Sequence, residues 1–204
     1  MRLLAFVLCL ITIHATAQIK AITDNGEEVI LYDNGTWKYV SKSDETVEIP
    51  VNSKEFRKPS TSSFQIKSSK VGIGVYINPK KWSFEKGEDS EAAEFKFQLK
   101  DSDAYGMLIA EKIEIPVENL KSIALDNARE VAPDIHISKQ EYRTVNGNKV
   151  LMMQMDGTMQ GMKFSYYGYY FSYEGGTIQL LTYTSQNLLE EYKPDANARV
   201  GIEN

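Results

Sequence analysis

Side chains able to do nucleophilic or metal chemistry are few in this sequence. It contains one cysteine, Cys9, and two histidines, His14 and His136. A Cys–His pair, a Ser–His–Asp triad and an ordinary zinc site all need more of these residues than the body of the chain offers. His136 stands in an alternating run between two isoleucines, which is typical of a histidine on the surface of a strand. We therefore expect no catalytic residue, no cofactor and no metal site.

Three short motifs carry the residues of a known kind of site without its context. Ser83 and Lys86 have Ser-x-x-Lys spacing, but the companion motifs of that class are absent. Residues 72–74, Gly-Ile-Gly, lead into a strand pattern, whereas a dinucleotide-binding turn opens a helix. Residues 101–103, Asp-Ser-Asp, do not continue in the register of a calcium loop. We interpret that segment as a solvated acidic turn.

Acidic residues leave one enzymatic alternative open. A glycosidase needs only two suitably placed carboxylates, and the sequence offers several. The candidates are Glu111, Glu114, Glu118 and Asp156. A carboxylate-based hydrolase acting on an envelope or dietary polymer is therefore the alternative to a non-catalytic protein.

The first seventeen residues, MRLLAFVLCLITIHATA, have the pattern of a signal peptide. Arg2 precedes an apolar run over 3–13 that is too short to span a bilayer, and Ala-Thr-Ala at 15–17 suits signal peptidase. We predict cleavage before Gln18, export to the periplasm or beyond, and no transmembrane segment in the mature chain. The chain has 23 basic and 28 acidic residues, so nucleic acid is not an expected partner.

Three segments are expected after the leader. Asn-Gly pairs at 25–26 and 34–35 separate short β-forming runs at 19–23, 27–32 and 36–40, which predicts a small β-meander over 18–40. Residues 41–62 are polar, contain two prolines and have the composition of a linker. The main domain is predicted over 63–204.

The main domain alternates between strand and helix patterns. Strands are predicted at 71–78, 93–99 and 105–115, then a helix between Pro116 and Pro133, then strands at 135–145, 149–155, 162–173 and 177–185. Asn146-Gly147 and Asp156-Gly157 are predicted turns, and Asn187 is expected to cap a closing helix that Pro194 interrupts. This order indicates an α+β fold in which helices flank an antiparallel sheet.

Several of these features resemble the PsbP/Mog-like family of α/β/α sandwiches. They are GVYINPKKW at 74–82, the single central helix, and the VNGNKVLMMQMDGT hairpin at 145–158 followed by a long aromatic strand. The resemblance covers residues 64–193 and implies a non-catalytic binding or assembly factor. Residues 19–40 separately resemble a short D/N-G-T-W module of exported bacterial proteins.

Aromatic residues are the best candidates for a partner contact. In MKFSYYGYYFSY, 162–173, alternation predicts one core face and a second face that carries Tyr167, Tyr169 and Tyr173. That second row suits contact with a protein or glycan, unless the fold buries both faces. The meander offers Tyr32, Trp37 and Tyr39, which predict either docking within the protein or self-association.

Overall fold

The main domain is built on one eight-stranded sheet. The computed structural model describes residues 19–23, 28–32, 35–39, 48–88 and 92–197, and the predicted signal peptide lies outside them. The strand order is β4-β10-β11-β12-β13-β9-β8-β7, antiparallel throughout except that β4 and β10 run parallel. The strands are β4 (Val51–Phe56), β7 (Trp82–Lys86), β8 (Ala93–Leu99), β9 (Tyr105–Glu111), β10 (His136–Val145), β11 (Asn148–Met159), β12 (Met162–Tyr173) and β13 (Gly176–Ser185).

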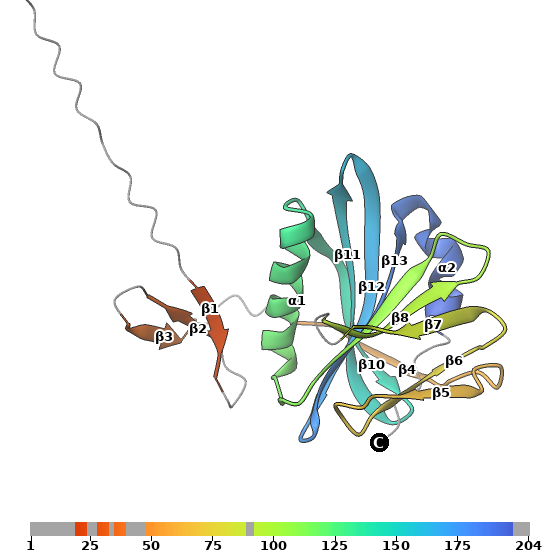
Figure 1. Ribbon diagram of the computed structural model, residues 1–204, viewed down its shortest axis with the longest axis horizontal. Coiled ribbons are helices and arrows are strands. Elements are labelled where there is room, and N and C mark those ends of the chain that lie inside the picture. Colours follow the sequence, from red (N-terminus) through yellow and green to blue (C-terminus); the bar gives the residue numbers. More distant parts are fainter. Residues whose placement is uncertain (1–18, 24–27, 33–34, 40–47, 89–91, 198–204) are drawn as a thin grey trace, which may run out of the picture.

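The predicted four-strand meander is present as β10 to β13 (Figure 1). Asn146 and Gly147 both have positive φ, 46° and 84°, as a type I′ hairpin turn requires. The next turn is not at Asp156-Gly157, where it was predicted, but at Gln160-Gly161, where φ is 51° and 80°. Gly157 stays within β11, and a Cβ there would lie 2.9 Å from the Cβ of Ile135. This glycine therefore permits close packing instead of a turn.

The central helix α1 (Val117–Val131) confirms the predicted helix. It begins directly after Pro116 and buries Leu120, Ala124 and Ala128, whose spacing places them on one helical face. These side chains pack over β11 and β12: Leu120 and Ala124 cluster with Met153, and Ala128 clusters with Met155. We call this side of the sheet the α1 face.

The opposite side, the α2 face, is covered by two elements. They are the hairpin of β5 (Phe64–Lys67) and β6 (Gly74–Ile77), and α2 (Leu189–Asn197), which follows a short 3₁₀ turn, η1 (Gln186–Leu188). Pro194 lies inside α2 and does not end it, and the residue before η1, Ser185, makes no side-chain capping bond. The interruption predicted at Pro194 is therefore wrong, and Asn187, the predicted cap, lies within η1.

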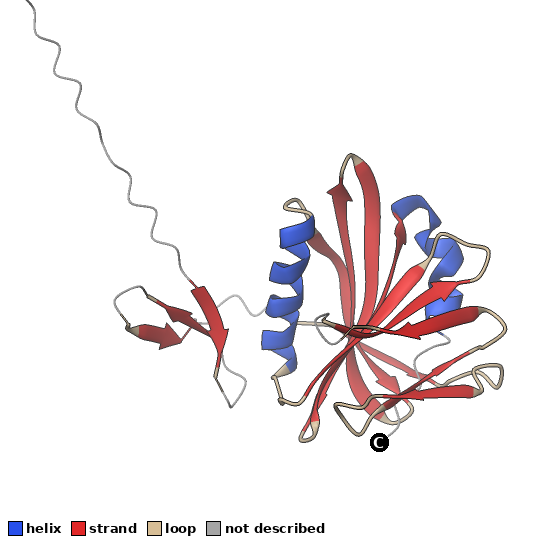
Figure 2. Ribbon diagram, viewed as in Figure 1, coloured by secondary structure: helices blue, strands red, loops and turns tan. Residues whose placement is uncertain are grey.

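The expected layer of helices on each side of the sheet is only partly present. The described residues are mostly strand, with one helix on each side, and the sheet is mixed (Figure 2). A helix is about 10 Å across, whereas eight strands about 4.8 Å apart extend over roughly 34 Å. Since no hairpin of the described residues supplements α1, they leave much of the α1 face uncovered. Neither helix is long and apolar enough to cross a bilayer.

Part of the predicted linker is a strand. Residues 51–56 form β4, which pairs with β10 through Tyr142↔Val51 and Thr144↔Glu55. Backbone hydrogen bonds fix both ends, from the Tyr142 amide to the Pro50 carbonyl (2.8 Å) and from the Asn146 amide to the Phe56 carbonyl (3.0 Å). Most of β4 is exposed, so its sequence lacks the apolar alternation that would have revealed a strand.

The N-terminal strands form a separate three-stranded antiparallel sheet beside α1 (Figure 1). They are β1 (Ile19–Ile22), β2 (Glu28–Leu31) and β3 (Trp37–Tyr39), in the order expected for the meander. The turn predicted at 24–26 lies outside the described residues.

Candidate binding surface

The predicted tyrosine row on β12 is not a surface. Tyr167 and Tyr169 are each only 2% exposed, because α2 and the β5–β6 hairpin cover their side of the sheet. Tyr173 is half-buried; its ring stacks on Phe171, and its hydroxyl accepts a hydrogen bond from the Gly72 amide (3.0 Å). For Tyr167 and Tyr169 the alternative, that the fold buries this face of the strand, holds.

The two buried tyrosines belong to a network around Arg143. Its Nη1 donates to the hydroxyls of Tyr167 (2.8 Å) and Tyr169 (2.6 Å), and its Nε donates to Glu141 (2.6 Å). Burial opposes ionisation of Glu141, yet hydrogen bonds, led by the one from Arg143, outweigh it and lower the pKa of that carboxyl. Asn197 of α2 accepts from both tyrosines. The network therefore ties α2 to the sheet.

The carboxylates considered for hydrolysis are divided between the two sides of the sheet. Asp156 lies on the α2 face, where it accepts hydrogen bonds from Ser165 (2.5 Å) and Gln154 (3.1 Å). Glu118 lies on α1 and accepts from the Tyr142 hydroxyl (3.0 Å). These two cannot form a catalytic pair. Within the described ranges, no three His, Cys, Asp or Glu side chains gather as a metal-ligating group.

The meander exposes an apolar row. Ile19 lies opposite Leu31, which lies opposite Trp37, and these side chains are 61%, 38% and 53% exposed. Tyr32 is half-buried at the end of β2, where its backbone closes the next turn. The backbone of Tyr39 pairs with Val29; its side chain lies outside the described part. Of the meander candidates, Trp37 is thus the aromatic side chain seen at the surface.

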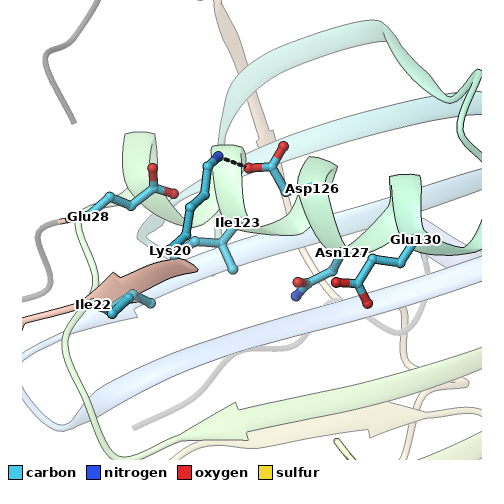
Figure 3. A pocket seen from close by; sticks show the side chains of 8 residues that line it. Lys20, Ile22, Glu28, Ile123, Asp126, Asn127 and Glu130 are labelled. Atoms are coloured by element: carbon cyan, nitrogen blue, oxygen red, sulfur yellow. Dashed lines mark hydrogen bonds and ion pairs between the residues drawn. The ribbon is translucent and has the colours of Figure 1, made fainter. Parts of the chain in front are cut away.

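The other face of the meander looks toward α1. Lys20, Ile22 and Glu28 line a cavity of about 370 Å³ whose far wall is α1, and Lys20 forms an ion pair with Asp126 (Figure 3). Burial raises the pKa of Glu28, an effect that Lys20 opposes and Asp126 reinforces. The internal contact is thus made largely by charged side chains, and the row that includes Trp37 is left outside it.

A second aromatic row crosses the uncovered part of the α1 face. Tyr105 of β9 lies opposite Tyr183 of β13, which lies opposite Tyr166 of β12. We call these three residues the tyrosine row. The rings of Tyr105 and Tyr183 stack with centroids 5.6 Å apart, and those of Tyr183 and Tyr166 meet edge to face at 5.9 Å. Tyr105 is 37% exposed and the other two are half-buried.

The tyrosine row leads into a groove of about 340 Å³ over β7 and β8. Ser83 pairs with Gln98, and Glu85 pairs with Lys96, so that polar side chains stand beside the aromatic rings. Burial raises the pKa of Tyr183; Tyr105 adds to the increase and Lys96 opposes it. The Tyr183 hydroxyl is therefore protonated at neutral pH and can both donate and accept a hydrogen bond.

Sequence reasoning missed this row. It assigned Tyr166 to a core face and did not single out Tyr105 or Tyr183. The three tyrosines come from strands that are adjacent only because β9 lies beside β13. Alternation within one strand shows which residues share its face, but strand order decides which strands are neighbours.

No family model matches the sequence, and no curated protein is similar to it. Its fold, however, is PsbP-like. It is similar to the solution structure of cyanobacterial PsbP (CyanoP) from Synechocystis sp. PCC 6803, at 11% identity over 67% of this chain and 88% of that chain, with a TM-score of 0.50. This likeness confirms the resemblance in fold.

Two weaker likenesses are to PA94, a protein of unknown function from Pseudomonas aeruginosa, and to LpqN, involved in cell envelope biogenesis of Mycobacterium tuberculosis. Identities are 12% and 15%, and TM-scores are 0.40 and 0.48. The matches cover 64% and 69% of this chain, and 88% and 90% of the other chains. Neither is close enough to support an argument. The resemblance of residues 19–40 to a module of exported proteins stays a prediction.

Proposed function

We propose that this protein is an exported, non-catalytic binding protein that holds a glycan segment along the tyrosine row. The observation that carries the proposal is the 340 Å³ groove beside Tyr105 and Tyr183, on a part of the sheet that α1 does not cover. Its volume falls within the range of about 300–1,000 Å³ that is usual for ligand pockets.

The lining of the groove suits a neutral, hydroxyl-rich chain. Tyrosine offers an apolar ring for contact and a hydroxyl for hydrogen bonding. Ser83 and Gln98 add neutral polar groups, and the one acidic and one basic side chain of the lining, Glu85 and Lys96, lie opposite each other. A ligand of high charge of either sign would meet an opposing charge and a like charge at the same place.

The lining also favours binding over hydrolysis. Glycoside hydrolysis normally uses two carboxyl groups on either side of the scissile bond. Among the residues that the structure describes, Glu85 is the single carboxylate that lines this groove. The export part of the proposal rests on the leader pattern of residues 1–17, and mass spectrometry of the exported protein is expected to find Gln18 at its N-terminus.

The test is a binding screen of the purified protein against polysaccharide oligomers and peptidoglycan fragments. Tyr105→Ala is expected to weaken binding of any ligand found by at least about tenfold, because it removes a contact face at the groove. Trp37→Ala is the matched control, an exposed aromatic on another surface. If only Trp37→Ala weakens binding, the groove is not the site. Release of shortened oligomers during the screen would overturn the non-catalytic part.

The exposed row of Ile19, Leu31 and Trp37 favours self-association as a second function. A row without charge is complementary to itself, so two copies can meet across a two-fold axis. Light scattering after size exclusion is expected to show a dimer that Trp37→Ser converts to a monomer. A monomeric wild-type protein at every concentration tested would eliminate this function and leave the glycan proposal intact.

A further inference from the structure

A second pocket, of about 120 Å³, lies between α1 and the sheet, and we call it the rim pocket. Aliphatic side chains from α1, β9 and β13 form its sides. They are Ala124, Ala128, Met107, Ile109 and Leu181. Among the residues that the structure describes, none with a charged side chain lines this pocket. It therefore differs from the groove, whose lining contains one acidic and one basic residue.

The rim pocket suits an apolar group that keeps one side toward solvent. Met107 and Ile109 on the sheet side are half-buried, and Asn127 on the helix side is exposed. Tyr170 beneath them is 0% exposed, and its hydroxyl is enclosed and has no hydrogen-bond partner among the described residues. A molecule in the pocket therefore meets aliphatic surface and makes no polar contact with Tyr170.

The rim pocket adjoins the groove of the tyrosine row. Tyr105 of the groove and Met107 of the pocket lie on one face of β9, where such neighbours are about 7 Å apart. Met107 also pairs with Lys96 of the groove, and Tyr166 of the pocket pairs with Tyr183 of the groove. The two hollows therefore form one path along β9 and β13, which is aromatic and polar at one end and aliphatic at the other.

We propose that the ligand is an amphiphile, whose glycan part lies along the tyrosine row and whose short apolar chain occupies the rim pocket. This inference rests on the glycan function proposed above and specifies the class of ligand. Since an apolar cavity of about 150 Å³ accommodates benzene, the 120 Å³ of the rim pocket suits a chain of about four to six carbons. Such a chain would cover the half-buried surface of Met107 and Ile109, which α1 leaves open.

The experiment compares methyl β-maltoside with hexyl β-maltoside, both kept below the concentration at which micelles form. The two probes have the same sugar, and the hexyl chain is longer by five methylenes. A fully buried methylene improves affinity about fourfold, and one that keeps a side toward solvent is expected to give about twofold. Hexyl maltoside is therefore expected to bind the full mature chain with a Kd about thirtyfold lower than that of methyl maltoside.

NMR during the titration shows where each part of the probe lies. Both maltosides are expected to shift the ring signals of Tyr105 and Tyr183, and hexyl maltoside alone to shift the methyl signals of Met107 and Ala124. Met107→Gln places a polar group in the path of the chain and should reduce the preference for hexyl maltoside to less than about fivefold. Val131→Ser is the matched control: Val131 is an apolar residue of α1 that is 49% exposed and lines neither hollow. It should leave the preference unchanged.

Equal affinity of the two maltosides, with shifts at Tyr105, would overturn this inference and leave the glycan proposal intact. A preference that survives Met107→Gln would overturn it as well, and so would chain-dependent shifts confined to Ile19 and Trp37, which would place the chain on the meander. Shifts at Met107 with none at Tyr105 would contradict the glycan groove and with it the joined ligand. If neither maltoside binds, the inference is wrong, and the polysaccharide screen decides the glycan proposal.

Discussion

The substitution Arg143→Met would remove the cation at the centre of the network on the α2 face. Methionine would keep an unbranched apolar side chain against Phe56, whose ring centroid lies 4.5 Å from the Arg143 guanidinium. The Glu141 carboxylate would lose its 2.6 Å partner. The hydroxyls of Tyr167 and Tyr169 would lose a charged donor at 2.8 and 2.6 Å.

The expected loss of stability follows from how deeply this pair is buried. The side chains of Arg143 and Glu141 are 8% and 15% exposed, so water replaces the lost partner only in part, although Asn52 still donates to Glu141. Removing one member of a buried ion pair typically costs about 3–5 kcal/mol. With a urea dependence of roughly 1–3 kcal/mol per molar, the unfolding midpoint should fall by about 1–5 M.

The chain contains a matched control for this measurement. Glu55 and Arg57 have the same Glu-x-Arg spacing and a 2.7 Å contact, but their side chains are 42% and 75% exposed. Urea unfolding followed by circular dichroism should show an unchanged midpoint for Arg57→Met. The double variant Arg143→Met with Glu141→Met should recover part of the loss, since it leaves no buried carboxylate unpaired.

The reasoning is refuted if Arg143→Met and Arg57→Met unfold at the same urea concentration. It is also refuted if the double variant is less stable than Arg143→Met alone. The first result would mean that solvent reaches Glu141. The second would mean that packing of Glu141, and not its charge, stabilises this region.

Three further predictions concern buried tyrosines, a buried carboxylate and the N-terminal segment. Tyr169→Phe should lower the free energy of unfolding by about 1–3 kcal/mol, because the Tyr169 hydroxyl pairs with a charged group. Tyr170→Phe should leave the free energy of unfolding unchanged. An equal loss in both variants would contradict this prediction. Hydrogen bonds from two serines outweigh the burial of Glu94 and lower its pKa from 4.5. The stability that the ionised carboxylate contributes is therefore fully present above about pH 4.5 and is lost as the pH falls through the lowered pKa. In the Glu94→Gln variant the urea midpoint should therefore fall less steeply as the pH is lowered below 4.5. An unchanged dependence of the midpoint on pH would contradict this prediction. Deleting residues 18–47 should leave the melting temperature nearly unchanged, because the contact with α1 includes an exposed ion pair that is expected to add little stability. Extending the deletion to residue 62 also removes β4 and should lower the melting temperature. Equal effects of the two deletions would contradict a stabilising role of β4.

The sequence alone was sufficient for elements whose signals are local. The helix between Pro116 and Pro133 follows from apolar spacing over four turns, and the Asn146-Gly147 hairpin follows from two residues that tolerate positive φ. It also predicted the three meander strands. At Gly157 the local turn signal failed: the turn forms at Gln160-Gly161, and Gly157 lies within β11 where Ile135 packs closely against it.

Only the tertiary structure decided which side chains face solvent and which face one another. Residues 51–56 look like a linker until β10 supplies a partner edge, and Tyr167 and Tyr169 look like a contact row until α2 and the β5–β6 hairpin cover them. The tyrosine row requires β9 to lie beside β13, which brings Tyr105 opposite Tyr183, 78 positions further along the chain (183 − 105). Sequence periodicity describes one helix or strand at a time. Burial and binding surfaces depend on which helices and strands lie next to one another in the fold.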